Sequence, residues 1–213
     1  VRFAVRLGFE IDPQTEGYIR HALESGIYYR IQGENGRAPA LETRLKSELK
    51  YILQAPYWKV ALQMLGDLQA LRCIHPTLDL DRELWRQLRL LEHFLQGRKK
   101  GEGEIGRGGD WEMGRKAGGE MGRDSYQLPI INIPDWQMRL EVLITYLAPE
   151  YREKVATNLQ LPADSIQRLQ ELEARKIEIL ERLPQCELPS QLVLLLRKYE
   201  LPMLIAIALQ SPR

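Results

Sequence analysis

The sequence predicts an all-α protein of about ten helices, and three observations support this prediction. Apolar residues recur every three to four positions along almost the whole chain, as in amphipathic helices. No segment alternates apolar and polar residues in the manner of a half-buried strand. Proline stands at the start of most of the periodic segments, where the first turn of a helix accepts it.

The first helices are predicted from their ends. Gly8 is expected to close a helix that starts near the N-terminus, because glycine readily takes the left-handed conformation found there. Asp12 and Pro13 then supply a capping carboxylate and a proline at the first helical position, so a second helix should run to about Glu24. A loop follows, and the periodic pattern resumes over residues 40–53.

The later helices follow the same logic. Pro56 precedes a fourth helix over residues 57–71, and a fifth is expected over residues 81–95. Five more helices, each introduced by proline, are expected over residues 136–147, 150–159, 163–181, 191–199 and from 202 almost to the end. The last of them is apolar on nearly all sides. We therefore expect it to be buried, with a covering C-terminal tail beyond Arg213.

A glycine-rich insert separates the two groups of helices. Residues 97–125 repeat the pair Gly-Arg and contain few apolar side chains, so they are expected to be disordered. Arg-Gly segments can contact an RNA backbone. Here the basic and acidic residues nearly cancel, which favours a neutral surface loop instead.

Composition and charge exclude several classes of protein. The formal net charge is only +1, so any nucleic-acid contact must come from a local surface. Cys73 and Cys186 lie far apart in the sequence and indicate reduced thiols in a cytoplasmic protein. The longest apolar run contains Pro202 and is far shorter than the ~20 residues of a membrane helix.

Catalytic chemistry is not predicted within this chain. No glycine-rich phosphate loop lies between a strand and a helix, and the three histidines are scattered. Asp79 and Asp81 have the spacing of a carboxylate pair that could hold Mg²⁺. Because they immediately precede a helix, Asp81 is better interpreted as its N-cap. We therefore predict neither a catalytic residue nor a metal ligand.

A basic stripe is predicted on the helix over residues 81–95. Arg82, Arg86, Arg89 and His93 share one narrow face at helical spacing. The opposite face carries the leucines expected in the core, which are Leu84, Leu88, Leu91 and Leu95. The three arginines are candidate RNA-binding residues, since such a stripe can follow a phosphate backbone. The alternative is an ordinary solvated helix face.

The opening of the chain resembles the neck region of bacterial class II tRNA nucleotidyltransferases and the related poly(A) polymerases. The matching residues of VRFAVRLGFEIDPQTEGYIRHA are Arg2, Phe3, Arg6, Leu7, Gly8, Phe9, Asp12, Pro13 and Thr15. A second match is ETRLKSEL, through Arg44, Glu48 and Leu49, although Thr43 stands where the family usually has glutamate. The resemblance is close over residues 1–76 and looser over residues 126–213.

The resemblance implies a neck-like region over residues 1–76 that binds RNA and braces the nucleotide pocket. A helical body over residues 77–213 would follow it. Arg2 and Arg6 would brace the base-selecting segment, and Arg44 and Glu48 would hold the geometry of the neck. The N-terminal catalytic head of the family, with its Mg²⁺ ions and CTP or ATP, would lie before Val1. The implied partner is the acceptor end of tRNA, and the chain alone is expected to be inactive.

A non-catalytic helical protein-interaction module is the alternative. Helical repeat proteins bind partners without catalysis, but their helices recur at a fixed period. No such period is found in this sequence. Loss of tRNA binding on removal of the acceptor end would distinguish the two hypotheses.

Overall fold

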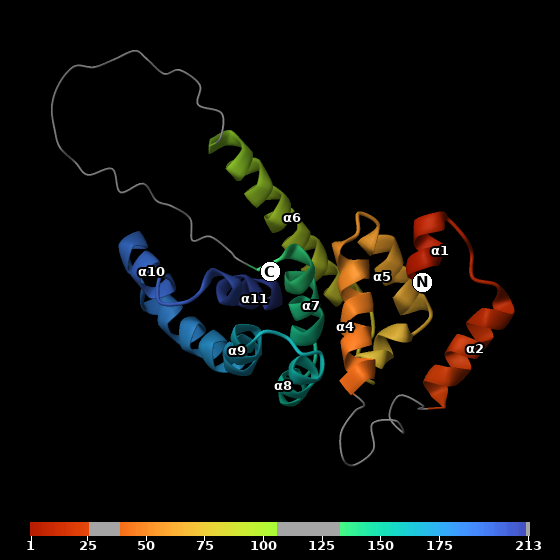
Figure 1. Cartoon of the computed structure of the whole chain (residues 1–213). Coiled ribbons are helices and arrows are strands. Elements are labelled where there is room, and N and C mark those ends of the chain that lie inside the picture. Colours follow the sequence, from red (N-terminus) through yellow and green to blue (C-terminus); the bar gives the residue numbers. More distant parts are fainter. Residues whose placement is uncertain (26–38, 106–132, 212–213) are drawn as a thin grey trace.

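A computed structural model describes residues 1–25, 39–105 and 133–211 (Figure 1). Within these residues the chain forms ten α-helices and two short 3₁₀ helices, with no strand, which confirms the all-α prediction. The loop expected through Gly33 and Gly36 lies outside the described residues, as does the insert beyond residue 105.

The two N-terminal helices form as predicted. Helix α1 (Arg2–Leu7) ends at Gly8, which has a φ of 71° in the left-handed region. Helix α2 (Pro13–Glu24) begins after Asp12, whose carboxylate accepts hydrogen bonds from the backbone amides of Gln14 and Thr15. Neither helix contains a buried residue, so both lie on the surface of the molecule.

Of the next two helices, one matches the prediction and the other ends earlier than expected. Helix α4 (Pro39–Gln54) matches it, but α5 (Trp58–Asp67) stops short of residue 71. Gln69 takes a left-handed φ of 57°, and the 3₁₀ helix η1 (Ala70–Cys73) follows. Just before this turn, Gly66 packs closely against the segment before α6, since a Cβ at this position would lie 2.9 Å from Leu80 Cδ2.

Helix α6 (Arg82–Ile105) is longer than predicted. It begins after Asp81 as expected but continues to Ile105, so residues 97–105 of the expected insert are helical. The predicted start of the disordered insert at residue 97 is therefore wrong. A tertiary contact extends the helix past Gly97, since Arg98 Nη2 donates to Asp135 Oδ1 at 2.8 Å.

The C-terminal helices begin near the prolines that predicted them. They are α7 (Asp135–Thr145), α8 (Pro149–Asn158), α9 (Ala163–Arg182), α10 (Pro189–Leu196) and α11 (Leu201–Gln210), with the 3₁₀ helix η2 (Leu183–Gln185) after α9. Helix α11 packs against α6, α7 and α9 and buries Met203, Ile205, Ile207 and Leu209. Its expected burial is thus confirmed, while the covering tail stays a prediction.

Helix α7 is the centre of the molecule. Every residue from 137 to 145 is buried, and the helix contacts α4, α6, α8, α9 and α11. One hydrophobic cluster extends from Leu49 to Leu209 and crosses the expected boundary between residues 76 and 77. In Figure 1, α1 and α2 lie at one end of the molecule and α10 at the other.

Candidate functional site

Two of the residues assigned by resemblance meet at the junction of α1 and α4. Arg2 Nε lies 3.4 Å from Glu48 Oε2. The guanidinium carbon of Arg2 also lies 4.7 Å from the ring centroid of Phe3 and 4.8 Å from that of Tyr51. A carboxylate and two aromatic faces together orient this guanidinium, because both kinds of group attract a cation.

The other two candidates remain at the surface. Arg6 and Arg44 are exposed, and within the described residues neither forms an ion pair. The roles predicted for Arg2, Arg6, Arg44 and Glu48 remain predictions. Their placement leaves Arg6 and Arg44 open to a phosphate or carboxylate partner.

The basic stripe on α6 divides into two kinds of arginine. The leucines on the opposite face of the helix are fully buried, as predicted. Arg82 and Arg89 are exposed, whereas Arg86 is half-buried and donates to Glu83 and to the carbonyl oxygen of Leu209 at 2.9 Å. The Arg86 hydrogen bonds lower the pKa of Glu83 to about 2. Arg86 therefore fastens α6 to the end of α11, whereas the RNA-binding role of the exposed Arg82 and Arg89 stays a prediction.

The Asp79 and Asp81 side chains have separate structural partners. Asp81 Oδ1 accepts the Leu84 amide at 2.8 Å, and its other oxygen accepts the Tyr146 hydroxyl. Burial, followed by this hydrogen bond, raises the pKa of Tyr146. Asp79 lies 3.5 Å from Arg72. The capping interpretation of Asp81 is confirmed, and in the described part of the chain no group of three metal-ligating side chains is found.

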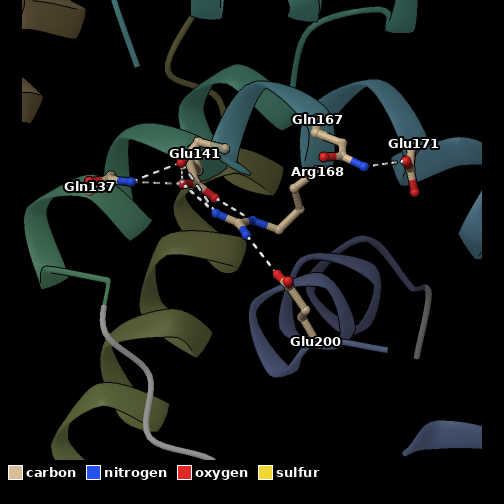
Figure 2. A network of polar contacts seen from close by, with 7 residues as sticks. Gln137, Glu141, Gln167, Arg168, Glu171 and Glu200 are labelled. Carbon is tan, nitrogen blue, oxygen red and sulfur yellow. Dashed lines mark hydrogen bonds and ion pairs between the residues drawn. The ribbon is translucent and has the colours of Figure 1, made fainter. Parts of the chain in front are cut away.

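A buried polar network joins α7, α9 and the start of α11 (Figure 2). Arg168 donates to both carboxylate oxygens of Glu141 at 3.1 Å and to Glu200 at 3.1 Å. Ser165 donates to Glu141 at 2.6 Å and accepts from Gln137 at 2.8 Å. Every member except Glu200 is buried, so this network fixes the relative positions of the helices.

Two further interior arginines act in the same way. Arg139 donates to the Leu53 carbonyl oxygen and to Glu92, each at 2.8 Å, and its guanidinium lies 4.8 Å from the Trp58 ring centroid. Arg152 ties α8 to α9 through Glu173 at 2.7 Å. The sequence analysis missed these arginines. Their only sequence signal is a charge at a position where the helical period demands an apolar residue.

A cavity of about 350 Å³ opens beside the buried network, between α9 and the α10–α11 segment. Its charged lining residues are largely paired with one another. Arg168 contacts Glu200, and Arg175 contacts Glu171 and Glu178. Because these charges satisfy each other, the cavity offers no strong preference for a charged ligand.

Large apolar side chains are exposed at both ends of the molecule. On α1 and just after it, Phe3, Leu7 and Phe9 are each more than half exposed, at 61%, 56% and 64%. The second group lies on α9, η2 and α10 and comprises Ile177, Leu180, Leu183, Leu188, Leu192, Val193 and Leu194. Exposed apolar patches of this kind are typical of surfaces that contact another molecule. None of the described helices is long and apolar enough to cross a membrane.

The fold resembles that of tRNA-processing enzymes. Two solved structures of a tRNA-processing enzyme, one a complex and one an apo form, match 98% of this chain with TM-scores of 0.65 and 0.64 at 16% and 17% identity. A complex of a CCA-adding enzyme with CTP matches 99% of the chain with a TM-score of 0.59 at 16% identity. No family model and no curated protein matches the sequence.

The match covers only part of each of those enzymes. This chain covers 47%, 50% and 42% of the three matched chains, so it spans about half of their length. At these identities the comparison establishes a shared all-α fold.

Proposed function

We propose that this chain is the RNA-binding neck and body portion of a tRNA 3′-end nucleotidyltransferase that adds CCA or A. The observation that carries the proposal is the fold likeness to tRNA-processing enzymes over nearly the whole chain. The Arg2–Glu48 contact supports it, because two residues assigned separately by the sequence resemblance lie against each other.

Catalysis would require a part of the enzyme outside these residues. Phosphoryl transfer from CTP or ATP depends on Mg²⁺ held by carboxylates. The described residues contain no cluster that could hold a metal ion, and the matched enzymes are about twice as long. We therefore assign the metal ions and the nucleoside triphosphate to a catalytic head, and the tRNA acceptor end to this chain.

A binding experiment tests the proposal. The purified chain is titrated with labelled tRNA and with the same tRNA lacking its acceptor stem, and anisotropy reports binding. We expect the truncated RNA to bind more weakly, because the neck and body would grip that end. Equal affinity for the two RNAs would contradict the proposal. In a parallel assay we expect the chain alone to incorporate no labelled nucleotide from CTP or ATP.

The exposed leucines and valine of α10 favour a second candidate, a protein-interaction module. Leu192, Val193 and Leu194 lie together on one short helix with Leu195 as its single buried residue. Recovery of a defined stoichiometric protein complex, together with indifference to tRNA, would favour this function over RNA binding.

A further inference from the structure

An open groove of about 430 Å³ lies between α5 and α6. Its lining residues are Lys59, Val60, Gln63, Met64, Asp67 and Trp85. The Trp85 indole N–H donates to Gln63 Oε1 at 3.1 Å, and Gln63 Nε2 donates to Asp67 Oδ1 at 2.8 Å. This chain of hydrogen bonds holds the Trp85 ring in a fixed orientation at the wall of the groove.

Three cations lie on the two helices that form the groove. Arg82 and Arg89 lie three residues before and four residues after Trp85, so they share its face of α6. Lys59 lines the groove from α5, with its Nζ 5.6 Å from the ring centroid of Trp58. All three are exposed, and in the described parts of the chain none of them forms an ion pair. Their charges are therefore available to an anionic ligand.

The acidic residues nearby offset at most one of these three positive charges. Glu83 is bound to Arg86 on the adjacent face of α6. Asp67 is the one carboxylate in the groove lining, and its Oδ1 already accepts from Gln63. Within the described residues its Oδ2 has no hydrogen-bond donor, so it can accept one from a ligand.

We propose that this groove binds an unpaired nucleotide of an RNA, with the base stacked on Trp85 and the neighbouring phosphates on Arg82 and Arg89. Aromatic side chains flanked by cations are the usual means of holding single-stranded nucleic acid. The Asp67 carboxylate favours a base with an exocyclic amino group, such as cytosine, adenine or guanine, over uracil, because it can accept a hydrogen bond from that group. The proposal rests on RNA binding by this chain but concerns residues other than Arg2, Arg6, Arg44 and Glu48.

The test uses the full chain and short labelled oligonucleotides of C, A or U, with binding followed by anisotropy at low salt. We expect C and A to bind more tightly than U. Trp85→Leu should weaken binding about tenfold, whereas Trp85→Phe should retain most of it, because phenylalanine still stacks. Circular dichroism and thermal unfolding check that each variant is folded, and the phenylalanine variant separates stacking from packing.

The cations are tested against a matched control. The double variant Arg82→Ala/Arg89→Ala should lower the salt dependence of binding by about two phosphate contacts. Arg197→Ala removes an exposed arginine at the C-cap of α10, away from the groove, and should change neither affinity nor salt dependence. Asp67→Asn should reduce the preference for C and A over U.

The outcomes separate this inference from the proposed function. If tRNA binds but Trp85→Leu binds all oligonucleotides as tightly as the natural chain, the groove is not the site and the proposed function stands. If oligonucleotide binding depends on Trp85 but tRNA binding ignores the acceptor stem, the groove stands and the proposed function fails. Absence of binding to every RNA overturns both.

Discussion

Helices α7 and α1 represent the two extremes of burial in this chain. In α7 nine consecutive residues are buried, and the charged residues among them, Arg139 and Glu141, are hydrogen-bonded to partners on other helices. In α1 no residue is buried, and its anchor is the contact of Arg2 with Glu48 and two aromatic rings. A helix of six residues is too short to be stable alone in water.

The difference indicates which charged residues are available to a ligand and which are needed to hold the fold together. A charged group inside the protein must have a partner, so the arginines around α7 are committed to the fold. An ion pair at the surface contributes little to the stability of the fold, so a surface charge can exchange its partner for a ligand. The candidate arginines of α1 and α4 belong to this second class. Substitution of a buried charged residue should therefore reduce stability, whereas substitution of a surface arginine should mainly reduce ligand binding.

The largest effect is expected from breaking the buried network at α7. Glu141→Ala leaves the Arg168 guanidinium without its main acceptor, and a buried unpaired charge costs about 3–5 kcal/mol. Urea unfolding followed by circular dichroism measures this loss. Glu200→Ala removes the exposed partner of the same arginine and should cost less than ~1 kcal/mol. If the two variants lost the same free energy of unfolding, the buried Glu141–Arg168 pair would not be more important for stability than the exposed one.

A slightly smaller effect is expected in the leucine core. Leu88→Ala on α6 removes a fully buried side chain and should lower the free energy of unfolding by about 3 kcal/mol, from lost burial and the cavity left behind. Leu194→Ala on α10 changes a side chain that is 62% exposed and should stay within about 0.5 kcal/mol of the natural chain. A large loss at Leu194 would mean that α10 is covered in solution.

The same contrast explains what the sequence could predict. Helix starts were predictable because capping and proline effects are local: Asp12 and Asp81 each accept amides two or three residues away. The buried leucines of α6 were predictable because a helix has a fixed period. Both signals lie within a few residues of the position they describe.

Contacts between distant residues could not be predicted in this way. The sequence places Arg86 in a basic stripe on the surface. In the structure it donates to the carbonyl oxygen of Leu209, which lies near the other end of the chain. The extension of α6 past Gly97 depends on Asp135, and the Arg168 network depends on three helices meeting. Helical period alone gives no partner for a charged residue, so these roles emerge only from the packing.

Helix capping in the two regions gives a third test. Asp81→Ala should lower the free energy of unfolding by about 1 kcal/mol, because α6 is part of the core and the loss is shared by the whole fold. Asp12→Ala should increase hydrogen exchange at the start of α2 and leave the global unfolding midpoint unchanged, since α2 buries no residue. A shift of the midpoint in both variants would mean that α2 unfolds together with the core.

The Asp12 cap also predicts a pH dependence. The side-chain hydrogen bond from Thr15 is the main cause that lowers the pKa of Asp12 below its ordinary 3.8. A carboxylate with a lowered folded pKa contributes stability that is present above its unfolded pKa and lost as the pH falls through the folded value. Amide exchange in the first turn of α2 should therefore stay slow near pH 4 and accelerate below the lowered pKa. In Asp12→Ala this acceleration should disappear.

The smallest effect on stability is expected at the anchor of α1. Arg2→Ala removes a half-buried ion pair and two cation–π contacts, and each such contact near the surface contributes about 1 kcal/mol or less. Because no residue of α1 is fully buried, we expect faster amide exchange in this helix, an unchanged urea midpoint and weaker binding of tRNA. Arg2→Lys keeps the charge but loses the planar group between the rings, so it should recover only part of the binding. If Arg2→Ala shifted the global midpoint as strongly as Leu88→Ala, α1 would be part of the core, and the separation between fixed and functional arginines would fail.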